Sequence, residues 1–474
     1  MPLTEAGKII IGNACRIDWE EVCPKNGDDE IYILGNPPYL GSSLQNRDQK
    51  KDTISIFTTY KIKKYKSLDY ISNWFIKASF YLRDFNIKCA FVTTDSICQG
   101  QQVELLWPHI EIINVEIFFA HNSFKWTNNA KSNAGVSVVI IGLRNFSKDN
   151  KYLLFGSLSK EVDNINFYLN SSKNIIVHKR SKVLSNLPIM SYGNKAVYGE
   201  PLILEKEEFL SLVNSNVEYK KFLKKLIGAK ELLDGKERWC IWVSNANYEE
   251  AKLLPELAKR FEEVKSLRLQ SKDLGAIQLA NRPYQFRDLY STKTNSIVIP
   301  LTTSERRLYI PIGFTNSDEI LTNSVSVIYN SDPSFLGILS SSIHLLWVKA
   351  VGGKLESRIR YSSVMCWNTF PFPQISTQRK NEITQSVFRI LEEREKHSDK
   401  TLAQLYDPDK MPEGLREAHR INDIIIERCY RSTPFTSDEE RLEYLFKLYE
   451  KMILEEKEQG TLFAQEKKTR KKKK

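Results

Sequence analysis

Short apolar runs alternate with a helical pattern over the first third of the chain. The spacing of apolar residues from Leu68 to Phe85 is that of an amphipathic helix. Around it lie runs rich in β-branched and aromatic residues, which are typical of strands: KIIIG, EIYILG, KCAFVTT, INVEIFFA and GVSVVIIGL. Strands that alternate with helices predict a wound α/β sheet from Lys8 to about Phe146.

The pattern changes twice after this sheet. From Leu187 to Phe372 the strand signals are irregular, with NSIVIP, RLYIPIGF and SVSVIYN the clearest, and 335–350 is predicted to be helical. After FPFP, charged helical patterns follow over 381–396, 415–430 and 437–457. We therefore divide the chain into an α/β domain (1–186), an α+β domain (187–373), a helical region (374–460) and a disordered basic tail (461–474).

Composition narrows the class of protein. The 41% of apolar residues are enough to bury real cores. A net charge of +11 favours a polyanionic partner, but the last eight residues alone hold seven basic side chains, so bulk charge is weak evidence for nucleic acid. We interpret the tail either as a nonspecific phosphate-binding segment or as a plain solubilising end.

Cysteine spacing and apolar runs exclude further classes. The seven cysteines include no C-x-x-C pair, so we expect no metal site and interpret them as reduced thiols in a cytoplasmic protein. The apolar stretch from Phe335 to Val351 is interrupted by serines, His344 and Lys349, and it predicts no membrane span.

The motif that carries chemistry is N-P-P-Y, at Asn36, Pro37, Pro38 and Tyr39, directly after the apolar run IYILG. That order places it at the carboxyl end of a strand, where open α/β sheets bind ligands. Such a motif suits chemistry on an exocyclic adenine amino group, which is a poor nucleophile unless both of its N–H groups are held by acceptors. The Asn36 side-chain carbonyl and the Pro37 backbone carbonyl can supply these two acceptors. The prolines stiffen the loop, and Tyr39 offers a ring against which an extruded base can stack. An ordinary turn is the alternative.

The residues around this motif carry a family resemblance. Three segments follow one another as in the large type II restriction-modification proteins of the MmeI group: GNPPYLGSSLQNRDQKKD, CAFVTTDSICQGQQVELLW and AHNSFKWTNNAKSNAGVSVVIIG. The chain resembles this group from the first of these segments to GLREAHRINDIIIERCY in the helical region. The resemblance implies a site-specific DNA adenine methyltransferase that takes its methyl group from S-adenosylmethionine. It also implies an incomplete Rossmann-like class I methyltransferase sheet, followed by an α+β target-recognition domain and a C-terminal helical region.

The same resemblance extends the candidate site. It gives the catalytic roles to Asn36, Pro37, Pro38 and Tyr39, and it makes Phe124 the second aromatic expected against the extruded base. An ordinary core phenylalanine is the alternative. Asn13 lies where related methyltransferases have a polar residue that contacts the adenine of the cofactor, and a strand-end turn is the alternative there.

The chain departs from this family in its cofactor site. Complete enzymes have a glycine-rich turn upstream of N-P-P-Y, followed by an acidic residue for the cofactor ribose, whereas no two glycines of this chain are separated by a single residue. Three explanations stay open: an upstream polypeptide carries the cofactor motif and a nuclease domain, the gene is a truncated remnant, or the start was assigned too late. We also expect the sheet to have an exposed apolar edge.

The second region resembles the target-recognition domain of the family. Glu356, Arg358 and Arg360 alternate with Ser357 and Ile359, so on an extended segment their side chains share one face and can reach base edges. A solvated strand face is the alternative. Arg306 and Arg307, together with Lys349, are interpreted as phosphate contacts, with a plain surface charge as the alternative.

Two functions remain open from the sequence. The first is an S-adenosylmethionine-dependent DNA adenine methyltransferase that acts on double-stranded DNA by base flipping, either with a partner chain or as part of a longer true product. The second is a non-catalytic DNA-binding specificity module, left from a split restriction-modification gene. Methylation of protein glutamine or RNA is a related chemistry, and the long domain after the motif argues against it.

Overall fold

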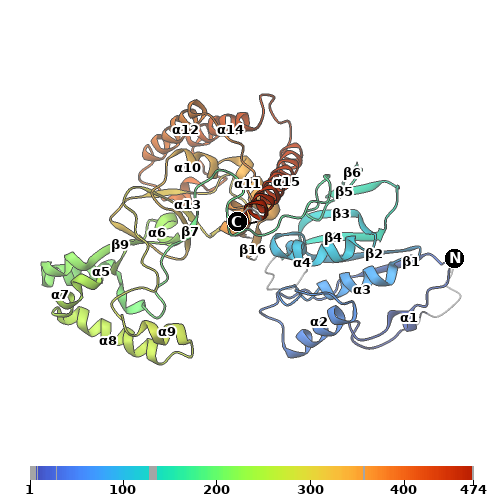
Figure 1. Cartoon of the computed structure of the whole chain (residues 1–474), viewed down its shortest axis with the longest axis horizontal. Helices are drawn as coiled ribbons and strands as arrows, with labels where there is room; N and C mark the ends of the chain where they lie inside the picture. Colours follow the sequence, from blue (N-terminus) through green and yellow to red (C-terminus); the bar gives the residue numbers. More distant parts are fainter. Residues whose placement is uncertain (1–6, 8, 28, 127–135, 356–357, 472–474) are drawn as a thin grey trace. The chain divides into compact units, whose positions relative to one another are not determined.

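The computed structural model describes residues 7, 9–27, 29–126, 136–355 and 358–471 (Figure 1). The chain folds into two compact units. Unit 1 comprises Met1–Lys179, Lys349–Ser357 and Thr436–Lys474, and unit 2 comprises Arg180–Val348 and Arg358–Phe435. Each unit is therefore assembled from segments that are distant in the sequence.

Unit 1 is built on a mixed six-stranded sheet in the order β1-β2-β4-β3-β5-β6. Strands β1 and β2 are parallel, β4 is antiparallel to both β2 and β3, and β5 is parallel to β3. Four of the predicted runs form β1 to β4, which confirms the α/β class of this region. The strands are β1 (Ile31–Gly35), β2 (Ile87–Thr94), β3 (Val115–Trp126), β4 (Val136–Asn145), β5 (Lys151–Phe155) and β6 (Leu158–Val162).

The strand predicted at KIIIG is wrong. The described residues of this run, 9–12, lie outside any strand, and Ile9 and Ile11 are 88% and 97% exposed. The run forms no ladder with any strand among the described residues, although Ile10 lines the same groove as residues of β1 (Ile31–Gly35). Its β-branched composition therefore does not produce a ladder, because a strand needs hydrogen-bonded neighbours more than it needs propensity.

Helices cover one face of this sheet. Phe75 of α3 packs edge-on against Phe91 of β2 and against Trp107 of α4, with ring centroids 5.4 and 5.8 Å apart. All three rings are at most 2% exposed, and burial of such side chains stabilises the fold by about 1.5–3 kcal/mol each. The helical elements of unit 1 are α1 (Trp19–Val22), α2 (Arg47–Thr59), α3 (Ser72–Leu82), η1 (Asp95–Cys98), α4 (Gly100–Glu111) and α15 (Asp438–Lys471).

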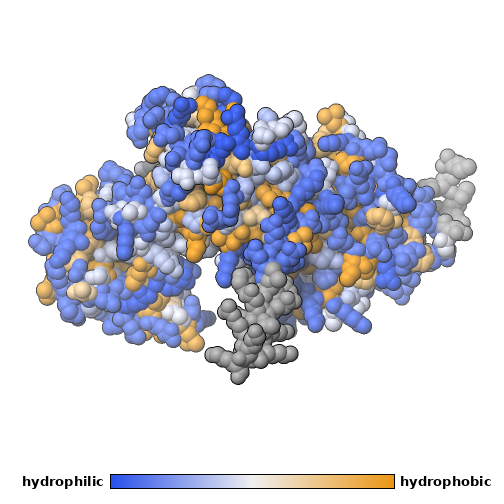
Figure 2. Space-filling view, turned by 45° about the horizontal axis from the view of Figure 1, so that its top comes forward, coloured by the Kyte–Doolittle hydropathy of each residue, from blue (hydrophilic) through white to orange (hydrophobic). Residues whose placement is uncertain are grey.

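The outer edge of the sheet is apolar and open. Strand β1 ends the strand order, and its Tyr32 and Leu34 are 59% and 77% exposed. A groove of about 400 Å³ runs along this edge, lined by β1 residues and by apolar residues such as Ile10, Ile17 and Trp19. The expected exposed apolar edge is thus confirmed. Elsewhere the visible surface is mostly hydrophilic, with separate apolar patches (Figure 2).

Unit 2 contains two four-stranded sheets, in the orders β14-β9-β10-β8 and β13-β11-β15-β7. Leu204, Leu226 and Val264, each fully buried, belong to the core that packs helix α8 (Pro255–Leu269) on the first sheet. The predicted strands NSIVIP and SVSVIYN form β11 and β15. The strands are β7 (Ser191–Tyr192), β8 (Ile203–Glu205), β9 (Leu223–Ile227), β10 (Arg238–Ile241), β11 (Ser296–Pro300), β12 (Thr302–Thr303), β13 (Gly313–Thr315), β14 (Glu319–Leu321), β15 (Val325–Ile328) and β17 (Arg358–Arg360).

Two further predictions need correction here. Most of the run RLYIPIGF is buried, but only its end forms a strand, β13 (Gly313–Thr315). Pro311 within the run has no N–H to donate to a neighbouring strand, which disfavours a ladder there. The single helix predicted over 335–350 is two helices, α10 (Ser334–Leu339) and α11 (Ser342–Val351). Ser341 separates them, because its Oγ accepts the His344 N–H at 3.3 Å and caps the second helix.

The remaining helices follow the charged patterns closely, except at the end of the chain. Helix α15 continues to Lys471, so the described part of the tail that was predicted to be disordered is helical, as suits a run of Glu, Gln, Lys and Arg. Residues 472–474 lie outside the described residues. The other helices of unit 2 are α5 (Lys206–Ser215), α6 (Ala229–Asp234), α7 (Tyr248–Lys252), α8 (Pro255–Leu269), α9 (Leu274–Leu279), α12 (Thr377–Glu395), α13 (Leu402–Leu405) and α14 (Glu413–Tyr430).

A buried histidine makes unit 2 sensitive to acid. Burial lowers the pKa of His344 to about 3. The Nε2 of its ring lies 3.1 Å from the Tyr361 hydroxyl, and its Nδ1 has no hydrogen-bond partner among the described residues. The unfolded chain binds a proton here below pH about 6.5, whereas the folded chain does not until about pH 3. The stability that the neutral ring contributes is therefore present above pH 6.5 and is lost as the pH falls toward 3.

We expect His344→Gln to make the free energy of unfolding of unit 2 less dependent on pH. Between pH 6 and pH 4 the wild-type slope should exceed that of the variant by up to about 1.4 kcal/mol per pH unit, which is one proton. Denaturant unfolding at a series of pH values measures this slope. The matched control is His397→Gln, after α12, and equal slopes for wild type and His344→Gln would contradict the assignment.

Candidate functional site

The N-P-P-Y motif forms the loop that leaves β1. Strand β1 pairs in parallel with β2, with Gly35 opposite Phe91, so the loop starts at the carboxyl edge of the sheet as predicted. Asn36 and Pro38 are exposed, Pro37 is buried and Tyr39 is half-buried. The loop therefore presents the Asn36 side chain to solvent at the edge where open α/β sheets bind ligands.

Hydrogen bonds from buried polar groups anchor this loop at the backbone of Leu40. The N–H of Leu40, directly after Tyr39, donates to Asp69 Oδ1 at 2.8 Å, and the Leu40 carbonyl accepts from the Tyr70 N–H and from Gln45 Nε2, both at 3.0 Å. Burial raises the pKa of the Asp69 carboxyl above its ordinary value, against the effect of the backbone N–H groups that it accepts. With its backbone anchored at Leu40, the loop is held ready before any ligand binds.

The ends of two other strands lie at the same edge. The register pairs Thr94 of β2 with Val138 of β4, and Val138 with Phe124 of β3. Phe124 thus lies at the sheet edge that carries Asn36, and its stacking on an extruded base stays a prediction. Its ring packs edge-on against His121, with centroids 4.9 Å apart.

A charged cluster near Phe124 was not predicted. Asp95, directly after β2 and 7% exposed, forms an ion pair with Lys354 and accepts a hydrogen bond from Ser123 Oγ at 3.4 Å. Lys354 reaches the pair from 259 positions away in the sequence. The polar run TTDS, which begins within the last residues of β2, was the only signal in the sequence, and it did not reveal the partner.

Asn13 belongs to a buried hydrogen-bond network. Its Oδ1 accepts the Cys15 N–H at 2.9 Å, and its Nδ2 donates to Asp52 Oδ2 at 3.0 Å. Asp52 also accepts from Arg16 Nε at 2.7 Å and from the Tyr70 hydroxyl at 2.8 Å. Burial alone would raise the pKa of Asp52, but these hydrogen bonds lower it below its ordinary value. The geometry gives Asn13 a structural role, and its contact with a cofactor stays a prediction.

The predicted base-reading row lies on β17. Arg358 and Arg360 are exposed and flank Ile359, which is 2% exposed, so the two arginines share one face of the strand. Strand β17 pairs with β12, with Arg360 opposite Thr302. Glu356 lies outside the described residues.

The predicted phosphate contacts differ from one another. Arg306 is exposed and forms an ion pair with Asp409 at 2.6 Å. Arg307 is half-buried and donates to Thr303 Oγ1 at 3.0 Å, and burial lowers its pKa. Lys349 is exposed in the last turn of α11. Arg306 is the better placed of the two arginines for an external phosphate.

Comparison with family models assigns all three parts of the chain. Residues 1–156 match the DNA-methyltransferase domain of MmeI, 171–374 match the MmeI target recognition domain, and 375–455 match the MmeI C-terminal domain. The chain belongs to the MmeI family. Asn36 and Phe124 lie in the part that matches the methyltransferase domain of this family, and Arg306 and Arg358 in the part that matches its target recognition domain.

Two similar proteins support the membership. The chain is 46% identical over 453 residues to DNA methyltransferase A of Bacillus subtilis (strain 168). The matched region covers 95% of this chain and 51% of that protein. It is also similar to the solved structure of the type IIL restriction-modification enzyme MmeI in complex with DNA, with a TM-score of 0.83 and 35% identity over 96% of this chain and 61% of that one. The chain thus spans about half the length of the curated relative it matches.

Neither metal binding nor membrane crossing is indicated. Within the described ranges, no group of three or more His, Cys, Asp or Glu side chains is arranged to hold a metal ion. The described helices include none with the length and apolar character needed to cross a membrane.

Proposed function

We propose that this chain provides the catalytic loop and the target-recognition domain of a DNA adenine N6-methyltransferase of restriction-modification type. The observation that carries the proposal is the N-P-P-Y loop, anchored through Leu40 and presenting Asn36 at the carboxyl edge of β1. Membership of the MmeI family supports DNA as the substrate. We also propose a cytoplasmic location, because the proposed substrate is DNA and because all seven cysteines are free thiols, as in a reducing compartment.

The residues of the loop suit an adenine amino group. The Asn36 side-chain carbonyl and the Pro37 backbone carbonyl accept its two N–H groups and favour a more pyramidal nitrogen, whose lone pair is then available to attack. Tyr39 and Phe124 supply aromatic faces for the base after it leaves the DNA stack. The base is a good fit because each of its polar hydrogens meets an acceptor that the loop already holds in place.

The described residues do not form a complete site for the methyl donor. S-adenosylmethionine, when bound, supplies an electrophilic methyl group, but the amide of Asn13 is already bonded to Cys15 and Asp52. The adjoining groove along β1 is lined mainly by apolar residues. We therefore propose that a glycine-rich motif outside these 474 residues, on an upstream polypeptide or on a longer form of this chain, completes the cofactor site.

The open edge of β1 is the surface at which we propose that the segment carrying this motif pairs. Strand β1 leaves one row of backbone N–H and C=O groups without a neighbouring strand, next to the exposed Tyr32 and Leu34. An added strand would pair with that row and bury both side chains, as in β-strand addition.

We expect the chain alone to bind S-adenosylmethionine weakly, and the chain mixed with the upstream polypeptide to bind it at least about ten times more tightly. Titration calorimetry with and without that polypeptide measures the difference. Leu34→Glu should remove the gain, because a charge buried at the docking edge is costly. The matched control is Leu158→Glu, which changes an equally exposed leucine on β6 at the opposite edge of the sheet. Tight one-to-one binding by the lone chain would contradict the proposal.

The test of the activity itself is direct. The completed enzyme is incubated with double-stranded DNA and S-adenosylmethionine, and the digested nucleosides are analysed by mass spectrometry for N6-methyladenine. DNA binding without methylation would favour the second candidate, a non-catalytic specificity module; the open sheet edge is the observation that keeps this alternative in view. Methylation of RNA or protein in place of DNA would overturn the choice of substrate.

A further inference from the structure

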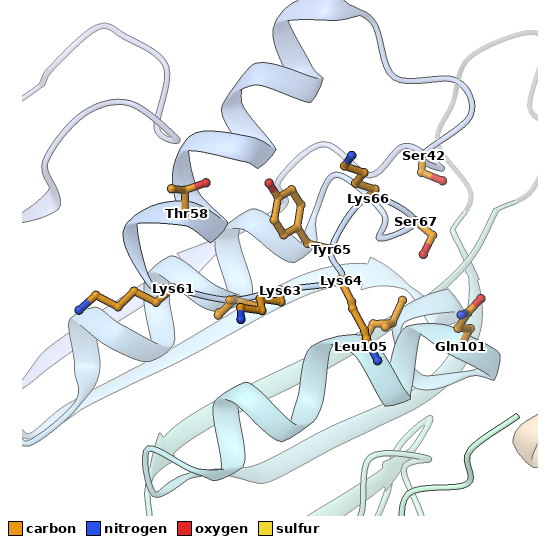
Figure 3. A pocket seen from close by; sticks show the side chains of 11 residues that line it. Ser42, Thr58, Lys61, Lys63, Lys64, Tyr65, Lys66, Ser67, Gln101 and Leu105 are labelled. Carbon is orange, nitrogen blue, oxygen red and sulfur yellow. The ribbon is translucent and has the colours of Figure 1, made fainter.

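Four lysines line a groove in unit 1 that is separate from the residues discussed so far. The loop between α2 and α3 carries Lys61, Lys63, Lys64 and Lys66, all exposed. They line a groove of about 870 Å³, which we call the lysine groove. Figure 3 shows the lysines spread along the loop around Tyr65, with Ser42, Ser67 and Gln101 at the end of the groove near Lys66.

The loop that carries the lysines is held in a defined conformation. Lys61 and Lys64 have φ angles of 56° and 62°, a left-handed conformation that is unfavourable for residues other than glycine. Between them the buried Ile62 donates its N–H to the Phe57 carbonyl at 2.8 Å, and the Tyr65 ring stacks on Phe57 with centroids 5.1 Å apart. Backbone in such a conformation persists only where surrounding contacts fix it, and it is concentrated at functional sites.

The charge in the lysine groove is not balanced by the protein. Among the described residues, no ion pair involves any of the four lysines, and none of the residues that line the groove is acidic. Four positive charges within six residues repel one another unless an anion lies between them. The floor is apolar, formed by Ile62 and Leu105, so the groove combines a basic rim with a surface against which sugar rings can pack.

The lysine groove adjoins the catalytic loop. Ser42, three residues after Tyr39, lines the groove. Gln45 bridges the segment after the lysines and the N-P-P-Y loop, since its Nε2 donates to both the Leu40 and the Leu68 carbonyls, at 3.0 and 3.1 Å. A ligand in the groove therefore lies next to the position at which the loop holds a base.

We propose that the lysine groove binds the sugar-phosphate backbone of the substrate DNA beside the extruded adenine. The inference rests on the proposed function, in that it takes DNA to be the substrate. Phosphate contacts of this kind give affinity and position without sequence information. The groove holds the strand near Asn36 while the target-recognition domain reads the bases.

The test replaces all four lysines by alanine in the full chain and measures binding to a labelled DNA duplex at a series of salt concentrations by fluorescence anisotropy. Each lost phosphate contact reduces the slope of log K against log[salt] by about 0.9, so we expect the slope to fall by up to about 3–4. Affinity at 0.1 M salt should fall by at least about 10-fold. The matched control replaces four other exposed lysines of unit 1, namely Lys148, Lys160, Lys173 and Lys179, and changes the net charge equally.

Thermal melting of both variants shows whether they fold. If the quadruple variant does not, the pair Lys63→Ala and Lys66→Ala replaces it, because neither position has a left-handed backbone, and about half the effect is expected. A slope that is unchanged, or that falls equally in the control, overturns the proposal. So does binding to an RNA duplex that depends on the four lysines more strongly than binding to DNA.

Methyl transfer by the completed enzyme, measured in parallel, separates this inference from the proposed function. If methylation is normal but the salt dependence does not involve the lysines, the groove assignment fails and the proposed function stands. If the lysines determine the salt dependence but no adenine is methylated, DNA binding in the groove stands and the proposed catalysis fails.

Discussion

Asn36→Ala, in the chain completed by its upstream polypeptide, is expected to reduce the rate of methyl transfer by at least about 10²–10³-fold, the effect of removing one preorganised group from a transition state. Affinity for DNA should remain within a few fold of wild type. Asn36 is exposed at the end of β1, and in the proposed mechanism it contacts the amino group only after the base has left the DNA stack.

Single-turnover rates at saturating DNA, together with equilibrium binding, separate these two effects. Asn150→Ala, at an exposed asparagine between β4 and β5, is the matched control and should leave both quantities unchanged. Asn36→Asp keeps an oxygen acceptor and should retain more activity than Asn36→Ala. Wild-type turnover by Asn36→Ala would remove the loop from the catalytic mechanism.

The sequence predicts the position of the catalytic loop, because that position depends on local order alone. An apolar run followed by N-P-P-Y is sufficient to place Asn36 after β1, and the next run places β2 beside it. The support behind the loop depends on contacts across the chain. Asp69 lies 29 positions from Leu40, and nothing in its local sequence indicates that it accepts the Leu40 N–H.

The same limit applies to charged side chains that are buried. Helix α8 has a charged pattern typical of a solvated helix, yet its Arg268 is fully buried and donates hydrogen bonds to five backbone carbonyls. Periodicity gives the face of a residue but not the partners that satisfy it. Lys354, which reaches Asp95 from a distant segment, escaped prediction for the same reason.

The strand that was predicted wrongly shows the opposite limit. The residues 9–12 have a composition as favourable for a strand as that of β1, but they form no ladder with a strand among the described residues. Strand formation requires hydrogen bonds to a second strand in register, and composition alone does not provide them. The edge of β1 near this run therefore keeps backbone groups with which an added strand could pair.

The last prediction separates reading of bases from binding of phosphates in the target-recognition domain. Arg358 and Arg360 share the exposed face of β17, on either side of the buried Ile359. If that face meets base edges, replacing either arginine by alanine should reduce methylation of the original site by about 5–150-fold, which corresponds to the 1–3 kcal/mol of one bidentate contact. It should also allow methylation of sites that differ at one base pair, because an arginine that requires guanine no longer excludes the other bases.

Arg306→Ala is the matched comparison, since Arg306 is also an exposed arginine of unit 2 but is paired with Asp409. It should weaken binding to all sequences about equally and reduce the salt slope by about 0.9 or less, without changing which adenines are methylated. Genome-wide mapping of methylated adenines for each variant distinguishes the two patterns. If Arg358→Ala and Arg360→Ala lower methylation at the original site and open no new one, the face of β17 binds backbone or is structural, since only a residue that discriminates between bases can change the set of sites when it is removed.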